Sequence, residues 1–137
     1  MQNISNRFKF QFLVFIILII SVCGGCGKNY KHISIEEAQQ MMNTESNYLI
    51  VDVRTKKEYD TKHVPGAVLL PIEEIRNGNV TEVLPDKNQT LMIYCWTGRR
   101  AEDSAIMLAN MGYKNVYEFG GLINWKGAIE GEEINNN

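Results

Sequence analysis

The sequence predicts an α/β fold, with a mostly parallel five-stranded sheet flanked by helices on both faces. Two short runs, residues 48–54 and 91–94, are almost continuously apolar, as expected of strands that are buried on both faces. Segments with helical periodicity or turn residues separate the apolar runs, an alternation typical of parallel sheets covered by helices. With 137 residues, the chain is long enough for one domain but not for two.

The first elements follow from local sequence signals. Residues 32–42 begin as a short strand and continue as a helix, because Ser34 and Glu37 have the spacing of a capping box. After the strand at 48–54, we expect a helical turn, a third strand and a second helical turn. These elements are predicted at residues 56–60, 67–70 and 72–77.

The second half contains the clearest helix. Residues 99–113 place small and apolar side chains on one face, and Gly112 is a stop signal. The apolar face consists of Ala101, Ala105, Leu108 and Ala109. The last strand is predicted at 115–119, followed by a closing turn and a short helix.

Several candidate functional residues follow the ends of predicted strands. Asp52, Cys95 and the pair Gly120–Gly121 each lie at or just after such an end. Ligands of parallel sheets bind beyond the carboxyl ends of the strands. We therefore expect these residues to cluster at one edge of the sheet.

Cys95 is the candidate nucleophile, in the stretch "LMIYCWTGRR". It lies between a buried strand and a helix N-terminus, where unpaired N–H groups and a partial positive charge favour a thiolate. Gly98 allows the loop N–H groups to turn inward, and Arg99 and Arg100 add positive charge. In the alternative interpretation, Cys95 is a small core residue and the arginines form a solvated face.

Composition excludes some classes of function. The formal net charge of −2 and the absence of a basic stripe argue against nucleic acid as a partner. Two scattered histidines do not have the spacing of metal ligands, so no metal and no cofactor are expected. Of the three cysteines, only Cys95 lies inside the predicted domain, which leaves it without an internal disulfide partner.

The N-terminus has the pattern of an export signal. Arg7 and Lys9 precede an apolar run at 12–20, and small residues follow. The apolar run is shorter than the roughly 20 residues of a membrane-spanning helix. We therefore predict a signal peptide over residues 1–25, and the alternative is an uncleaved anchor helix.

The small residues before Cys26 resemble the lipobox of bacterial lipoproteins. That resemblance implies cleavage before Cys26, lipid on its sulfur, and a chain anchored to the bacterial cell membrane outside the cytoplasm. The match departs from the pattern because Cys23 stands where an aliphatic residue is usual. Two alternatives are lipid on Cys23, disfavoured by the large preceding Val22, and a redox or metal pair formed by Cys23 and Cys26.

The expected organisation is a linker at residues 26–31, a domain at 32–130 and a polar tail at 131–137. Across this domain the sequence resembles the rhodanese family of single-domain sulfurtransferases. The resemblance rests on four motifs in family order: "IVDVRTKKEYDTKHVPGAVLLP", "YCWTGRRA", "LANMGYKNVYEF" and "GGLINWKGA". Departures from the family pattern are Lys62 in place of Gly, Ala101 in place of Ser, and Glu118–Phe119 in place of an aliphatic pair.

The resemblance implies a two-step sulfur transfer through a persulfide on Cys95. The loop of Trp96, Thr97, Gly98, Arg99 and Arg100 would then bind the substrate, a small sulfur-containing anion such as thiosulfate. The resemblance favours Arg100 as the inward arginine, with Arg99 nearer the mouth and Trp96 positioned to select substrates. A thiol or a protein would accept the sulfur, and we expect a monomer.

Two other classes of function share parts of this pattern. Phosphatases and arsenate reductases of related fold have five residues between their Cys and Arg, whereas four separate Cys95 from Arg100. The shorter loop leaves too little room for phosphate. A non-catalytic sulfur carrier or binding module would share the fold, but inactive members typically lack the cysteine.

Overall fold

The computed structural model describes residues 29–132. The predicted signal peptide, Cys23, the predicted lipidation site Cys26 and the end of the polar tail lie outside these residues. None of the helices in the described range combines the length and apolar character needed to cross a bilayer.

Five strands form one sheet in the order β1-β5-β4-β2-β3. Every neighbouring pair is parallel, so the sheet is wholly parallel rather than mostly so. The strands are β1 (Lys31–His32), β2 (Tyr48–Asp52), β3 (Val68–Leu69), β4 (Thr90–Cys95) and β5 (Asn115–Gly121). The predicted α/β fold is therefore confirmed.

Helices connect the strands, as the alternating sequence pattern predicted. They are α2 (Ile35–Thr44), α3 (Lys56–Thr61), α4 (Ile72–Arg76) and α5 (Arg99–Asn110), followed by the 3-10 turn η2 (Leu122–Asn124). The predicted capping box begins α2, since Ser34 accepts the N–H of Glu37 and Glu37 accepts the N–H of Ser34. Thr55 and Glu58 form a second capping box at α3.

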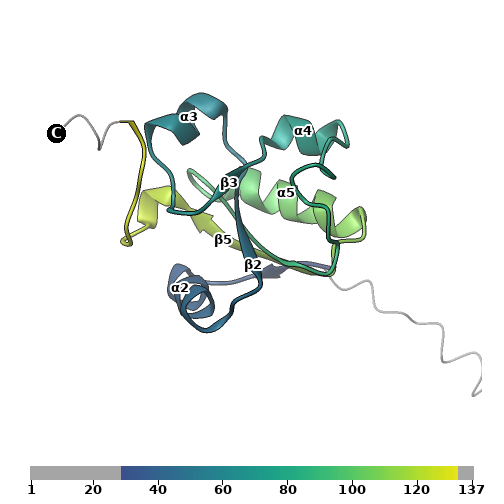
Figure 1. Ribbon diagram of the computed structural model, residues 1–137, viewed down its shortest axis with the longest axis horizontal. Coiled ribbons are helices and arrows are strands. Elements are labelled where there is room, and N and C mark those ends of the chain that lie inside the picture. Colours follow the sequence, from purple (N-terminus) through teal and green to yellow (C-terminus); the bar gives the residue numbers. More distant parts are fainter. Residues whose placement is uncertain (1–28, 133–137) are drawn as a thin grey trace, which may run out of the picture.

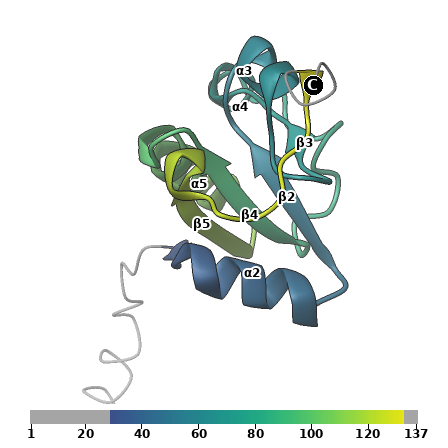
Figure 2. The same ribbon diagram turned by 90° about the vertical axis from the view of Figure 1, so that its left-hand side faces the viewer.

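The sheet separates two apolar layers, because successive side chains of a strand point to opposite faces. On β4, Leu91, Ile93 and Cys95 pack on the face covered by α4 and α5. Met92 and Tyr94 point to the other face, which α2 covers. Figures 1 and 2 show α2 and α5 on opposite sides of the sheet.

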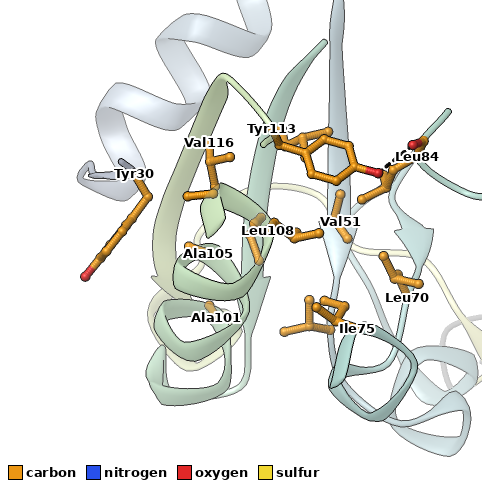
Figure 3. Packing of buried hydrophobic residues seen from close by; sticks show 14 of the residues in the cluster. Tyr30, Val51, Leu70, Ile75, Leu84, Ala101, Ala105, Leu108, Tyr113 and Val116 are labelled. Carbon is orange, nitrogen blue, oxygen red and sulfur yellow. Dashed lines mark hydrogen bonds between the residues drawn. The ribbon is translucent and has the colours of Figure 1, made fainter. Parts of the chain in front are cut away.

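Small residues let α5 approach the sheet closely. Ala101, Ala105 and Leu108 are fully buried and lie over the central strands (Figure 3). Tyr113 in the same layer is buried, and its hydroxyl donates to the carbonyl of Leu84 (Figure 3). This layer forms the largest part of the core and holds the N-terminus of α5 beside the end of β4.

Element boundaries differ from the predictions at a few positions. β2 ends at Asp52 rather than Arg54, because the Arg54 N–H donates to the Asp52 carboxylate instead of continuing the strand. α5 ends at Asn110, and Gly112 follows with a φ of +95°, a conformation that favours glycine. β5 extends to Gly121, two residues beyond its predicted end.

Candidate active site

Cys95 is the last residue of β4, the central strand, and therefore lies at the carboxyl edge of the sheet. It pairs in register with Gly121 of β5, and the preceding Tyr94 pairs with Asp52 of β2. The predicted cluster of Asp52, Cys95 and Gly120–Gly121 at one sheet edge is thus confirmed. The thiol is 1% exposed.

The Cys95 sulfur takes the place of a helix cap. The N–H of Gly98 donates to Sγ at 3.0 Å, and no side chain caps α5 at Gly98. Gly98 has a φ of +104°, which turns its N–H back toward the sulfur. Because the N-terminus of a helix carries partial positive charge, a sulfur anion is stabilised in this position.

The active-site loop packs directly against the backbone of two glycines, Gly120 and Gly121. A Cβ on Gly121 would lie 2.3 Å from the carbonyl oxygen of Trp96 and 2.7 Å from Cα of Thr97. The Trp96 carbonyl also accepts the N–H of Ile123 at 3.1 Å. Gly98 packs against Gly120, whose Cα would lie 3.2 Å from a Cβ at position 98. Only glycine at position 121 allows this approach of the two backbones.

Arg100 turns inward and forms a two-pronged ion pair with Glu58 of α3. Its Nη1 and Nη2 donate to the two carboxylate oxygens at 2.9 and 2.8 Å. The hydrogen bond from Arg100 lowers the pKa of Glu58 to about 2. The pKa of Arg100 is raised, chiefly by Glu58 and further by the neighbouring Cys95 sulfur. Arg100 therefore supplies positive charge to the sulfur while Glu58 holds its position.

The other predicted loop residues face outward. Thr97 and Arg99 are exposed, and Trp96 is half-buried with its ring against the apolar layer on the α2 face. The Nζ of Lys62 lies 5.2 Å from the centre of the Trp96 ring. The loop residues thus divide into an inward part, Cys95 with Gly98 and Arg100, and an outward part.

A buried ion pair supports the site from β2. The Asp52 carboxylate accepts hydrogen bonds from three nitrogens of Arg54, the backbone N–H, Nε and Nη2, and one more from the Tyr94 hydroxyl. Burial and the Asp52 charge raise the pKa of Tyr94 above its usual range, which keeps this hydroxyl a donor. Arg54 also donates from Nη2 to the carbonyl of Lys62 at 2.7 Å. The pair therefore ties β2 to the turn after α3.

Sequence reasoning did not assign roles to Glu58 or Tyr94. A local signal existed for Glu58, because Thr55 and Glu58 have the spacing of a capping box. The pairing of Glu58 with Arg100 spans 42 residues and has no sequence signature. Tyr94 looks like an ordinary strand residue until its hydroxyl is found on Asp52.

Comparison with known protein families agrees with this arrangement of Cys95, the loop and the arginines. The sequence matches the family described as rhodanese-like domain over residues 34–128. The chain belongs to the rhodanese-like family. The match includes every element of the rhodanese-like sheet except β1, and the whole active-site loop.

Curated relatives of this rhodanese-like chain include sulfur-handling proteins. Thiosulfate sulfurtransferase PspE of Escherichia coli K12 is 40% identical over 72 residues, which are 53% of this chain and 68% of PspE. Thiosulfate sulfurtransferase GlpE of Pseudoalteromonas translucida is 29% identical over 72% of this chain and 91% of GlpE. The putative sulfur carrier protein YrkF of Bacillus subtilis is 32% identical, and the match spans only 52% of its length.

Solved rhodanese structures share the fold. A rhodanese with anions from E. coli has a TM-score of 0.55 and 34% identity, over 62% of this chain and 99% of the other. A rhodanese-like domain protein from Staphylococcus aureus has a TM-score of 0.65 and 28% identity, over 74% of this chain and 98% of the other.

The close packing of the loop against Gly121 predicts the effect of adding a methyl group at this position. In Gly121→Ala, the active-site loop must move, because the new Cβ meets backbone atoms and not a flexible side chain. We expect the free energy of unfolding in urea to fall by about 1–3 kcal/mol and the amide NMR signals of Thr97 and Gly98 to shift. The control is Gly78→Ala, where a Cβ meets no atom within 4 Å and only the positive φ is strained. Loop signals that stay in place in Gly121→Ala would contradict this account.

The Glu58–Arg100 pair predicts a pH-dependent contribution to stability. Because folding lowers the pKa of Glu58 from 4.5 to about 2, the contribution is present above pH 4.5 and is lost as pH falls toward 2. Glu58→Gln keeps a group that can cap α3 but removes the charge. Since the pair is about one-third exposed, we expect a loss of no more than about 1 kcal/mol at pH 7.

The measurement is urea unfolding of wild type and Glu58→Gln between pH 3 and 7. The difference between them should shrink below pH 4.5. Glu73→Gln is the control, because Glu73 forms only a longer, exposed pair with Arg76. A difference that stays constant across this pH range would show that charge pairing is not the cause.

Proposed function

We propose that this chain is a sulfurtransferase of the thiosulfate type, which moves a sulfane sulfur through a persulfide on Cys95. The observation that carries the proposal is the Gly98 N–H on the Cys95 sulfur at the N-terminus of α5. A thiolate is the nucleophilic form of cysteine, and this position stabilises it. The names of PspE and GlpE support the same chemistry for this chain.

In the first step, the Cys95 thiolate attacks the outer sulfur of thiosulfate. A bond forms between the two sulfurs, the S–S bond of thiosulfate breaks, and sulfite leaves with the electron pair. The product is a Cys95 persulfide anion. The N–H groups of the loop and the charge of Arg100 are preorganised for an anion here, so no reorganisation accompanies the transfer.

In the second step, an acceptor nucleophile attacks the outer sulfur of the persulfide. The acceptor is a thiolate, or cyanide in an assay. The Cys95 thiolate leaves with the electron pair and returns to its starting state. Each step exchanges one sulfur–sulfur bond for another bond to sulfur, so no external oxidant or reductant is needed.

The two arginines have different roles in this proposal. Arg100 is held against Glu58 and faces the sulfur, so it stabilises the thiolate and the persulfide. Arg99 is exposed at the mouth of the site, where its guanidinium can meet the sulfite end of the donor. A planar, two-pronged donor suits an oxyanion better than an ammonium group does.

The test is thiosulfate:cyanide sulfurtransferase activity of the full-length chain in detergent, together with its intact mass after treatment with thiosulfate. Thiocyanate should form in the wild type, and the mass should rise by one sulfur. Both signals should disappear in Cys95→Ser, because an alcohol is not ionised at neutral pH. A persulfide without turnover would favour a carrier, the function that the name of YrkF suggests for that relative. If the wild type gave neither thiocyanate nor the mass increase, the proposal would be overturned.

We further propose that the chain is exported and held at the cell membrane by lipid on Cys26. This proposal depends on the sequence pattern alone, because residues 1–28 lie outside the described structure. Expression in bacteria with labelled palmitate should label the wild type and Cys23→Ala but not Cys26→Ala. Unlabelled wild-type protein that retains its first residues would instead indicate an uncleaved anchor.

A further inference from the structure

A pocket opens beside the active-site loop, on the side of α3. It has a volume of about 340 Å³, within the range of small-molecule sites. One wall comes from α3 and the turn after it, and the other wall is Trp96, the residue next to Cys95. The lining residues are Arg54, Thr55, Lys57, Glu58, Thr61, Lys62 and Trp96. We call it the α3 pocket.

The α3 pocket has an excess of positive charge. Arg54 is neutralised by Asp52, and Glu58 is neutralised by Arg100. Lys57 and Lys62 form no ion pair with any residue between 29 and 132. Since the whole chain is acidic, with a net charge of −2, this pocket is a local exception that favours an anion.

Lys62 connects the pocket to the reacting sulfur. Its ammonium lies over the Trp96 ring, 5.2 Å from the ring centre. This cation–π contact orients the side chain along the pocket wall. Glu58, which also lines the pocket, holds Arg100 beside the Cys95 sulfur, so the pocket adjoins the active site through this ion pair.

The backbone of Lys62 is held in place from three sides. Its carbonyl accepts Nη2 of the buried Arg54 at 2.7 Å, and its N–H donates to the carbonyl of Glu58 at 3.3 Å. Gly131 packs so closely that a Cβ there would lie 2.7 Å from Cα of Lys62. The lysine is therefore presented on a fixed support, as a specificity residue requires.

These features of the α3 pocket favour the sulfur acceptor over the sulfur donor as its ligand. Arg99 and the N-terminus of α5 favour a small donor anion at the loop itself. The α3 pocket is larger than thiosulfate requires and is lined by an aromatic ring as well as two lysines. It suits an organic molecule with an anionic group at one end.

On the basis of the proposed function, we infer that the α3 pocket binds the anionic group of the sulfur acceptor, with Lys62 as the specificity-determining residue. The acceptor class is a small thiol that carries a carboxylate. Its thiolate attacks the outer sulfur of the Cys95 persulfide, the persulfide S–S bond breaks, and Cys95 keeps the electron pair. The acceptor leaves as its own persulfide.

The experiment measures the discharge of the Cys95 persulfide, separately from its formation. The full-length chain is loaded with sulfur by thiosulfate or by polysulfide. It is then mixed with 3-mercaptopropionate, 2-mercaptoethanol or cysteamine, three thiols of similar size with negative, zero and positive charge. Second-order rate constants are compared per thiolate, so that differences in thiol ionisation do not enter.

We expect the wild type to discharge fastest to 3-mercaptopropionate. In Lys62→Gln, that rate constant should fall by about fivefold, the effect of one solvent-accessible ion contact, while the rate constant for 2-mercaptoethanol stays unchanged. Lys62→Arg should restore the preference. Lys114→Gln is the matched control, because Lys114 is exposed and precedes β5, at the opposite edge of the sheet from Cys95.

Three results of the discharge measurement would overturn the inference. Equal losses with all three thiols would show that Lys62 only supports the loop. If Lys62→Gln slowed only the formation of the persulfide, Lys62 would act in binding the donor. If no rate changed, Lys62 would have no role in either step. Loading by polysulfide but not by thiosulfate would contradict the proposed donor and still allow the acceptor test. Loading by neither reagent would contradict both proposals.

Discussion

The buried carboxylate of Asp52 is the constraint on which the site depends. It is fully shielded from water, and a buried charge is tolerated only when it is paired and hydrogen-bonded. Arg54 and Tyr94 meet this requirement, and both make a second bond: Arg54 to the Lys62 carbonyl and Tyr94 to the N–H of Val64. The carboxylate thereby joins β2, β4 and the turn after α3, the three segments that meet beside Cys95.

The reacting sulfur is placed between supports that cannot easily move. β4 brings Cys95 to the carboxyl edge of the sheet, and α5 begins four residues later. Gly121 lets the loop between them pack closely against β5. Glu58 then fixes Arg100 from a separate helix. The proposed sulfur transfer passes through anions at every stage, and donors that are already oriented suit such a reaction.

Charge is distributed unevenly around this sulfur. Arg100 and the N-terminus of α5 lie beside the sulfur, while two lysines line the α3 pocket. Glu58 lies between the two sides and is committed to Arg100. The protein thus offers two separate anion-favouring regions next to one cysteine, an arrangement suited to a reaction with two substrates that bind in turn.

The amino-acid sequence was enough to predict the order of strands and helices, the capping of α2 and the position of Cys95 before α5, because these depend on periodicity and on neighbours along the chain. It also indicated the sheet edge at which Cys95 lies. Three contacts became visible only in the folded chain: Arg100 with Glu58, the Tyr94 hydroxyl with Asp52, and Lys62 over the Trp96 ring. These contacts join segments more than 30 residues apart. Such contacts depend on how β2, β4 and their helices pack, and local sequence signals carry no information about that packing.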